Sequence, residues 1–257
     1  MIFLFHALFL PLTLKYIFVK IGKMKSEGMI LFNFEFNIQD LGVQPVKKIN
    51  KDSVQSNLER LRRRFGFNKK VPKEVLSNFF TAIGYYPELK HVNIKVRYGN
   101  IKTTMQCRPR WDFLFHKKGN RSYVMYIGNK TKNGNGILYK DLPLNAQIGV
   151  VGHELAHIID YQRMNNLQLC RFGIDYLTSK KKREIENRID LIAIHRGLGY
   201  QIRDFSKYVF EESGASFEYL KYKMKFYFRP YQIKEILATN PIYSKESYEL
   251  KAVTVDI

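Results

Sequence analysis

The chain has 257 residues, of which 45% are hydrophobic, 26% charged and 14% aromatic. This composition can build a packed core and excludes a largely disordered protein. Its two cysteines, Cys107 and Cys170, are too few for a disulfide framework or a four-thiolate zinc site. The excess of 43 Lys and Arg over 23 Asp and Glu leaves a net charge of +20. This charge favours weak contact with nucleic acid or an anionic membrane, or reflects a solvated lysine-rich surface.

The N-terminal residues 1–19 are almost entirely apolar. No positive charge precedes them and no small-residue cleavage site follows, so a cleaved secretion signal is disfavoured. Two interpretations stay open: an uncleaved anchor with its flanking lysines in the cytoplasm, or a start codon placed too early, with Met24 or Met29 as the true initiator. Both predict a cytoplasmic or cytoplasm-facing protein. We expect an apolar segment over residues 1–28 and a single domain over 29–257.

The first predicted elements are a strand and two helices. Apolar residues alternate from Ile30 to Ile38, as in a half-buried strand. Apolar residues recur at helical spacing over about residues 53–64, and Gly66 ends that pattern. Pro72 then stands where a second helix would begin.

From Pro87 onward the pattern changes to short strands separated by turn-rich pieces. Helical periodicity returns after Pro143 for some twenty residues, and another helix is expected from about Thr178 to His195, ended by Gly197 and Gly199. Together these elements predict an α+β fold with a small antiparallel sheet and further helices in the C-terminal half. The three strands are expected at His91 to Arg97, Ile101 to Cys107 and Ser122 to Ile127.

The helix predicted after Pro143 contains the sequence His153-Glu154-Leu155-Ala156-His157. At 3.6 residues per turn, His153 and His157 lie about 40° apart on one face, so both imidazoles can reach one ion. Glu154 lies about 100° round the helix, where it can reach a water molecule at that ion. This spacing predicts a pair of metal ligands and a general base.

The remaining residues of this helix predict which side of it packs. Apolar side chains gather opposite the histidines, whereas Gly149 and Asp160 share the histidine face. One face is therefore expected to pack against the core and the other to open onto a site. The competing interpretation is a pair of solvent-facing histidines on an amphipathic helix.

A catalytic zinc usually takes three protein ligands, so the two histidines need a third. The next predicted helix offers Glu184, Glu186 and Asp190. Glu186 and Asp190 lie four residues apart on one face, whereas Glu184 points nearly opposite to Glu186. Glu186 is therefore the better ligand, and Asp190 can orient a ligating histidine through its distal N–H. Taken alone, this pair would also fit an exposed acidic face among lysines.

The HELAH sequence, followed by Glu186-Asn187-Arg188-Ile189-Asp190, resembles the HExxH and ExxxD motifs of gluzincin metallopeptidases such as thermolysin. The short chain is similar to the compact minigluzincins, and the resemblance covers about Lys70 to Asp204. It implies a zincin-like fold in which a small sheet packs on the active-site helix. It also implies that the edge strand above that helix is Ser122 to Ile127.

The same resemblance implies roles for particular residues. One zinc ion per chain would be held by His153, His157 and Glu186, with Glu154 as general base and Asp190 supporting a ligand. The expected activity is hydrolysis of peptide bonds in protein or peptide substrates, by an endopeptidase rather than an exopeptidase. The chain shows no match to the additional Tyr or His with which thermolysin stabilises the oxyanion. Candidates for that role are Tyr161, His195 and Tyr200.

The alternative function is a basic nucleic-acid-binding or regulatory protein whose zinc is structural or incidental. Only the net charge supports it, because the sequence shows no helix-turn-helix pattern, no Cys-x-x-Cys finger and no basic helix free of acidic residues. A peptidase acting on DNA-bound or membrane-bound substrates would combine both properties. The sequence does not predict an oligomeric state.

Overall fold

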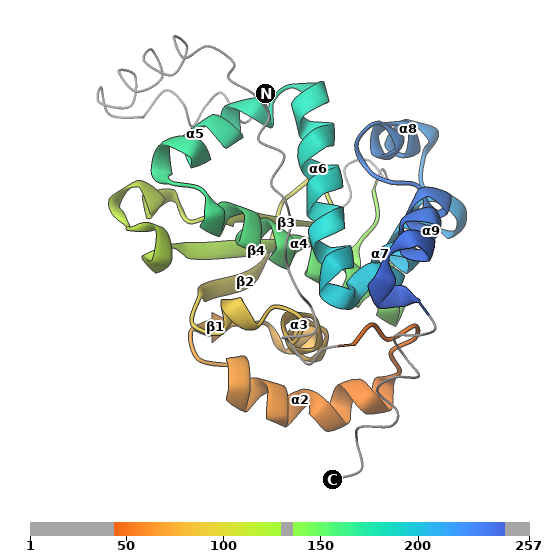
Figure 1. Cartoon of the computed structure of the whole chain (residues 1–257), viewed down its shortest axis with the longest axis horizontal. Helices are drawn as coiled ribbons and strands as arrows, with labels where there is room; N and C mark the ends of the chain where they lie inside the picture. Colours follow the sequence, from red (N-terminus) through yellow and green to blue (C-terminus); the bar gives the residue numbers. More distant parts are fainter. Residues whose placement is uncertain (1–43, 130–135, 245–257) are drawn as a thin grey trace. The chain divides into compact units, whose positions relative to one another are not determined.

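The computed structural model describes residues 44–129 and 136–244 (Figure 1). The predicted strand at 30–38 and the apolar segment 1–28 lie outside these ranges. Within them the chain is α+β and mostly helical, as expected, with one small sheet. Among the described helices, none combines the length and the apolar character needed to cross a bilayer.

The described elements follow one another closely along the chain. The strands are β1 (Lys69–Lys70), β2 (Asn93–Gly99), β3 (Met105–Pro109) and β4 (Ser122–Gly128). The α-helices are α2 (Lys51–Phe65), α3 (Leu76–Ile83), α4 (Leu144–Arg163), α5 (Asn166–Asp175), α6 (Ser179–Ala193), α7 (Gly199–Lys207), α8 (Phe217–Phe226) and α9 (Pro230–Thr239). Short 3₁₀ helices cover Lys73–Val75, Pro87–Leu89, Trp111–Phe115, Lys118–Asn120, Tyr139–Asp141 and Pro241–Tyr243, and π-helical turns cover Ile194–Leu198 and Tyr208–Glu212.

The first two described helices lie close to where the sequence predicts them, although α2 begins two residues earlier and α3 starts only after a 3₁₀ turn. The side chain of Asn50 accepts a 2.7 Å hydrogen bond from the Ser53 N–H at the start of α2, and Gly66 follows the last residue of that helix. Pro72 precedes a 3₁₀ turn that leads into α3. The buried face of α3 includes Phe79, and this helix contacts both α2 and α4.

The sheet is mixed, so the prediction of an antiparallel sheet was wrong. Its strand order is β1-β2-β4-β3: β2 pairs in parallel with both β1 and β4, and only β3 and β4 are antiparallel. The turn-rich residues 100–104 therefore do not close a hairpin, because β4 enters between β2 and β3. Alternating apolar residues indicate which face of a strand is buried, but not which strand lies beside it.

The edge strand next to the histidine helix is also different from the one expected. Ser122 to Ile127 forms most of β4, which is internal, whereas β3 is the edge strand and contacts α4. The hydroxyl of Tyr161 on α4 donates a 3.2 Å hydrogen bond to the Cys107 carbonyl on β3. Strand β3 is thus a direct link between the sheet and the central helix α4.

One face of the sheet is apolar and the other polar. Tyr123, Met125 and Ile127 of β4 are buried in the same core as Leu155 and Ile158 of α4. The basic side chains of the opposite face are exposed, including Lys95, Arg97 and Arg108. This alternation is typical of a sheet covered by helices on one side.

Helix α4 lies at the centre of the fold, in contact with α3, α6, α7 and β3. Figure 1 shows the strands on one side of α4 and helices α6 to α9 on the other. Sixteen of its residues are buried, on all sides of the helix, so the histidine face is covered as well as the apolar face. A Cβ at Gly149 would lie 2.2 Å from the Gln201 carbonyl oxygen, so glycine there allows α7 to pack closely.

The helix predicted at 178–195 is α6. The chain continues from it into α7, which packs against α4 and contributes to the burial of that helix. Gly197 has a φ of 93°, a value that side-chain-bearing residues rarely adopt, and it separates α6 from α7. The predicted break at Gly197 is therefore confirmed, whereas Gly199 begins α7 rather than ending α6. Helix α7 then covers the face of α4 that carries Gly149.

Candidate metal centre

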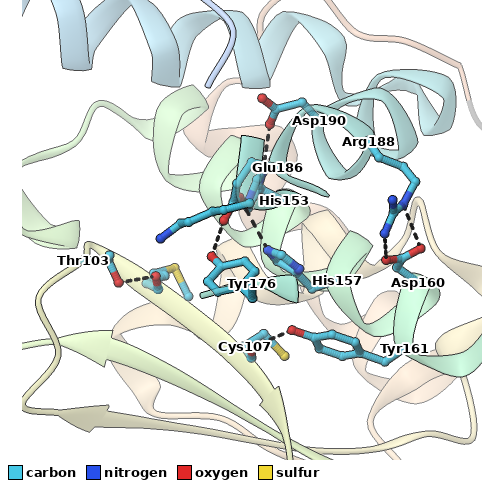
Figure 2. Close-up of polar contacts among 12 residues, drawn as sticks. Thr103, Cys107, His153, His157, Asp160, Tyr161, Tyr176, Glu186, Arg188 and Asp190 are labelled. Carbon is cyan, nitrogen blue, oxygen red and sulfur yellow. Dashed lines mark hydrogen bonds and ion pairs between the residues drawn. The ribbon is translucent and has the colours of Figure 1, made fainter. Parts of the chain in front are cut away.

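The structure brings together the three side chains expected to bind a metal ion (Figure 2). His153 Nε2 lies 3.1 Å and His157 Nε2 3.8 Å from the same oxygen, Glu186 Oε2. One ligand atom from each residue lies within 4.8 Å of the others. The histidines are one turn apart on α4, and α6 packs against α4 so that Glu186 faces both rings. This buried cluster is able to hold a metal ion.

The distances and the chemistry of the cluster fit a zinc ion. Ligands roughly 2.0–2.1 Å from a tetrahedral ion lie about 3.3–3.4 Å from one another, and the two measured separations bracket that value. Two imidazole nitrogens and one carboxylate oxygen form a donor set found in catalytic zinc sites. The identity of the ion remains a prediction.

His157 is in the neutral protonation state that a metal ligand needs. Burial lowers its pKa to about 3, because the low-dielectric surroundings disfavour the charged imidazolium. The ring is therefore neutral, as metal binding requires. Its Nδ1 atom has no hydrogen-bond partner within residues 44–129 and 136–244.

His153 is held from both sides by carboxylates. Its Nδ1 lies 2.8 Å from Asp190 Oδ1, and its Nε2 faces Glu186. Burial lowers the pKa of His153, but the hydrogen bonds to Asp190 and Glu186 outweigh it and raise the pKa to about 10. Asp190 thus contacts one of the two histidines predicted to bind the metal, as helical spacing predicted.

Glu186 is almost completely buried and is anchored by a residue that the sequence analysis missed. Burial alone would raise the pKa of Glu186, but the contacts with His153 and His157 and a hydrogen bond from Tyr176 hold it well below its usual value. The Tyr176 hydroxyl donates to Oε1, which leaves Oε2 for the histidines. Tyr176 follows α5 and lies ten residues before Glu186, a spacing that carries no recognisable signal.

Glu154 lies in the same buried region and faces β3. Burial raises its pKa to about 7, although the charges of His153 and Lys223 and the backbone N–H of Cys107 act in the opposite direction. Its Oε2 atom finds no hydrogen-bond partner in the described part of the chain. A buried carboxylate with a pKa near neutrality is suited to accept and return a proton.

Helix α8 adds a buried lysine near the cluster that the sequence analysis also missed. The Lys223 side chain is only 5% exposed, and its ammonium group lies 4.2 Å from the ring centroid of Tyr227. The Tyr227 ring in turn lies 5.9 Å from the ring of His153. Lys223 forms no ion pair with any described carboxylate, so aromatic rings provide the contacts observed for its charge. No motif distinguishes this lysine from its neighbours in the sequence.

Asp160 contacts α6, as the two histidines do, but it belongs to an ion pair rather than to the metal cluster. It accepts hydrogen bonds of 3.2 and 2.7 Å from Arg188, which joins α4 to α6 (Figure 2). This bidentate ion pair holds the two helices that carry the metal cluster.

Of the three candidates for an oxyanion-stabilising residue, Tyr161 lies beside the cluster. Its ring stacks on that of His157 with centroids 5.7 Å apart, and its hydroxyl donates to the Cys107 carbonyl. His195 Nδ1 lies 2.7 Å from the Leu191 carbonyl oxygen, and the Tyr200 ring packs edge-on against Tyr243. Cys107 and Cys170 are both free thiols.

No protein-family model matches the chain, and comparisons with curated proteins and with solved structures find no significant match.

Proposed function

We propose that this chain is a zinc-dependent peptidase with a zincin-like arrangement, acting as an endopeptidase on protein or peptide substrates. One observation carries the proposal. His153, His157 and Glu186 converge from two helices. Glu154, whose Oε2 has no hydrogen-bond partner among the described residues, lies in the same buried region. Together they form the set of side chains that metal-dependent hydrolysis requires: three ligands and a base.

In this proposal His153, His157 and Glu186 hold the zinc ion, and Asp190 and Tyr176 fix the orientation of two of these ligands. When bound, zinc supplies Lewis acidity, which lowers the pKa of a water molecule and polarises a carbonyl group. The protein's contribution is to keep the donor atoms in place and to surround them with apolar core.

Glu154 is the proposed general base. Its carboxylate accepts a proton from the attacking water and returns it to the leaving amine nitrogen. A pKa of about 7 allows the group to perform both transfers near neutral pH, since neither protonation state is strongly favoured.

Strand β3 supports a peptide as the substrate. It is the edge strand beside α4, and Cys107 on this strand lies next to Glu154. An edge strand can bind an extended peptide through main-chain hydrogen bonds. Such pairing would bring a scissile bond close to the base.

Metal analysis of the purified protein tests the proposal. We expect about one zinc ion per chain, lost in Glu186→Ala and retained in Glu184→Ala. Glu184 is a matched control because it belongs to the same helix and pairs with Lys181 at 3.2 Å. A folded wild-type protein without zinc would end the proposal.

Catalysis is tested separately with Glu154→Gln. This variant should retain zinc and fold but lose hydrolysis of a peptide library, because an amide neither accepts nor delivers the proton. Cleavage at the wild-type rate would remove Glu154 as the base. Zinc binding without hydrolysis by the wild type would favour the alternative of a structural zinc in a nucleic-acid-binding protein.

A further inference from the structure

Two aromatic side chains lie almost wholly in water on the turn that follows β3. Trp111 is 78% and Phe115 79% exposed, and both belong to the 3₁₀ helix Trp111–Phe115. We call this segment the aromatic turn. Aromatic side chains that remain outside the core do not contribute their burial energy to folding, and clustered exposure of this kind marks interaction surfaces.

Contacts of the neighbouring residues hold the aromatic turn in place. The Asn166 side chain at the start of α5 donates hydrogen bonds of 3.1 and 3.4 Å to the carbonyl oxygens of Leu114 and His116. Phe113, between the two exposed rings, packs against the core. Residues 113–116 are thus fixed to the body of the protein, and Trp111 and Phe115 point outward from that fixed support.

Basic residues precede and follow the aromatic turn in the sequence. Between Arg108 and Lys118 the chain carries four Lys and Arg residues but only one carboxylate, Asp112. That carboxylate lies 3.2 Å from Arg110 and 3.4 Å from His116, so its charge is offset locally. The aromatic turn is therefore flanked in the sequence by an excess of positive charge.

We propose that the aromatic turn docks onto an anionic membrane surface, with Trp111 and Phe115 entering the headgroup region and Arg110, Lys117 and Lys118 contacting lipid phosphates. Tryptophan is favoured at membrane interfaces, and basic residues beside it are attracted to anionic lipids. Combined apolar insertion and charge complementarity suit such a surface better than either feature alone. This inference goes beyond the proposed hydrolysis and does not depend on it.

The geometry favours a membrane over a nucleic acid as the partner. Proteins that stack bases present their rings in a positively charged groove that follows the backbone. On the nearby basic face of the sheet, the Tyr126 ring already contacts two guanidinium groups, with Arg97 at 4.7 Å and Arg108 at 4.8 Å from its centroid. That ring is engaged, whereas Trp111 and Phe115 protrude into solvent as insertion requires.

Intrinsic fluorescence provides a local test in the full-length chain, because Trp111 is the only tryptophan. Vesicles of phosphatidylcholine with 30% phosphatidylserine should shift its emission to shorter wavelength, and brominated lipid should quench it. Pure phosphatidylcholine vesicles should cause a much smaller change. The apolar residues 1–28 contain no tryptophan, so their own binding would not give this signal.

Variants separate the contributions of the rings and the charges. Phe115→Ser should weaken the fluorescence-detected binding about tenfold, whereas Phe217→Ser, which removes a 70% exposed ring on α8, should leave it unchanged. The double change Lys117→Gln with Lys118→Gln should reduce binding to the anionic vesicles and make it less dependent on salt. Circular dichroism would show that each variant is folded.

Three results would overturn the proposal. The first is unchanged Trp111 emission with anionic vesicles. The second is an equal shift with phosphatidylcholine alone, which would remove the anionic lipid from the interaction. The third is stoichiometric quenching by a single-stranded oligonucleotide while vesicles have no effect, which would assign the aromatic turn to nucleic acid.

Discussion

His153 on α4 and Asp190 on α6 meet through a 2.8 Å hydrogen bond between Nδ1 and Oδ1, which leaves the opposite ring nitrogen directed at Glu186. This contact determines how the His153 ring is oriented toward the metal cluster. Both partners are buried, so water competes little for the bond.

Removal of the Asp190 carboxylate should weaken zinc binding without removing a ligand. We expect Asp190→Ala to lower zinc affinity by about 10- to 100-fold, because the ring of His153 loses its support. Competition with a chromophoric chelator measures this change. Glu184→Ala is the control, since Glu184 lies on the same helix but pairs with Lys181 and is not among the proposed ligands. Equal affinity losses in both variants would contradict a specific role for Asp190.

Zinc uptake should release a proton from His153. In the metal-free protein the two carboxylates keep this ring protonated, and a ligand nitrogen must lose its proton to bind. We expect about one proton released per zinc near pH 7, with apparent affinity rising about tenfold per pH unit below the pKa of His153. Calorimetry in buffers of different ionisation enthalpy counts the protons. Use of Glu154→Gln removes the other group that titrates there; a count near zero would contradict the prediction.

Glu154 should make the stability of the metal-free protein depend on pH. Burial raises its pKa from 4.5 to about 7 in the folded state, so the folded chain holds a proton that the unfolded chain has lost. This group therefore stabilises the fold below about pH 4.5, and the contribution is lost as pH rises through about 7. Relative to Glu154→Gln, the unfolding free energy of the wild type should fall over that window. Urea denaturation at pH 5, 6, 7 and 8 measures it, and a constant difference would refute the assignment.

Gly149 should be essential to the packing of α7 on α4. In Gly149→Ala the new Cβ would lie 2.2 Å from the Gln201 carbonyl oxygen, so the helices must separate. We expect a loss of about 1–3 kcal/mol in unfolding free energy. Gly173→Ala on α5 is the control, because its Cβ would meet no atom within 4 Å and alanine favours a helix. A Gly149→Ala variant as stable as wild type would show that α7 can move away freely.

Several features of the fold could be predicted because they depend on neighbours in the sequence. The end of α2 at Gly66 and the break at Gly197 follow from the backbone preferences of single residues. The sheet order could not be predicted in this way, because the parallel pairing of β2 with β4 joins segments separated by more than twenty residues. Local turn signals between β2 and β3 suggested a hairpin that the fold does not form.

The sequence by itself determined that His153 and His157 share one helical face and that Glu186 and Asp190 share another, because spacings of four residues are converted to positions by helix geometry alone. Only the tertiary structure decided that these two faces meet in the core, that Tyr176 anchors Glu186 and that Lys223 lies near Glu154. It also decided that the histidine helix is buried on all sides. These outcomes depend on which surfaces pack together. Packing depends on the shapes and volumes of side chains from segments far apart in the sequence, which a local sequence pattern does not contain.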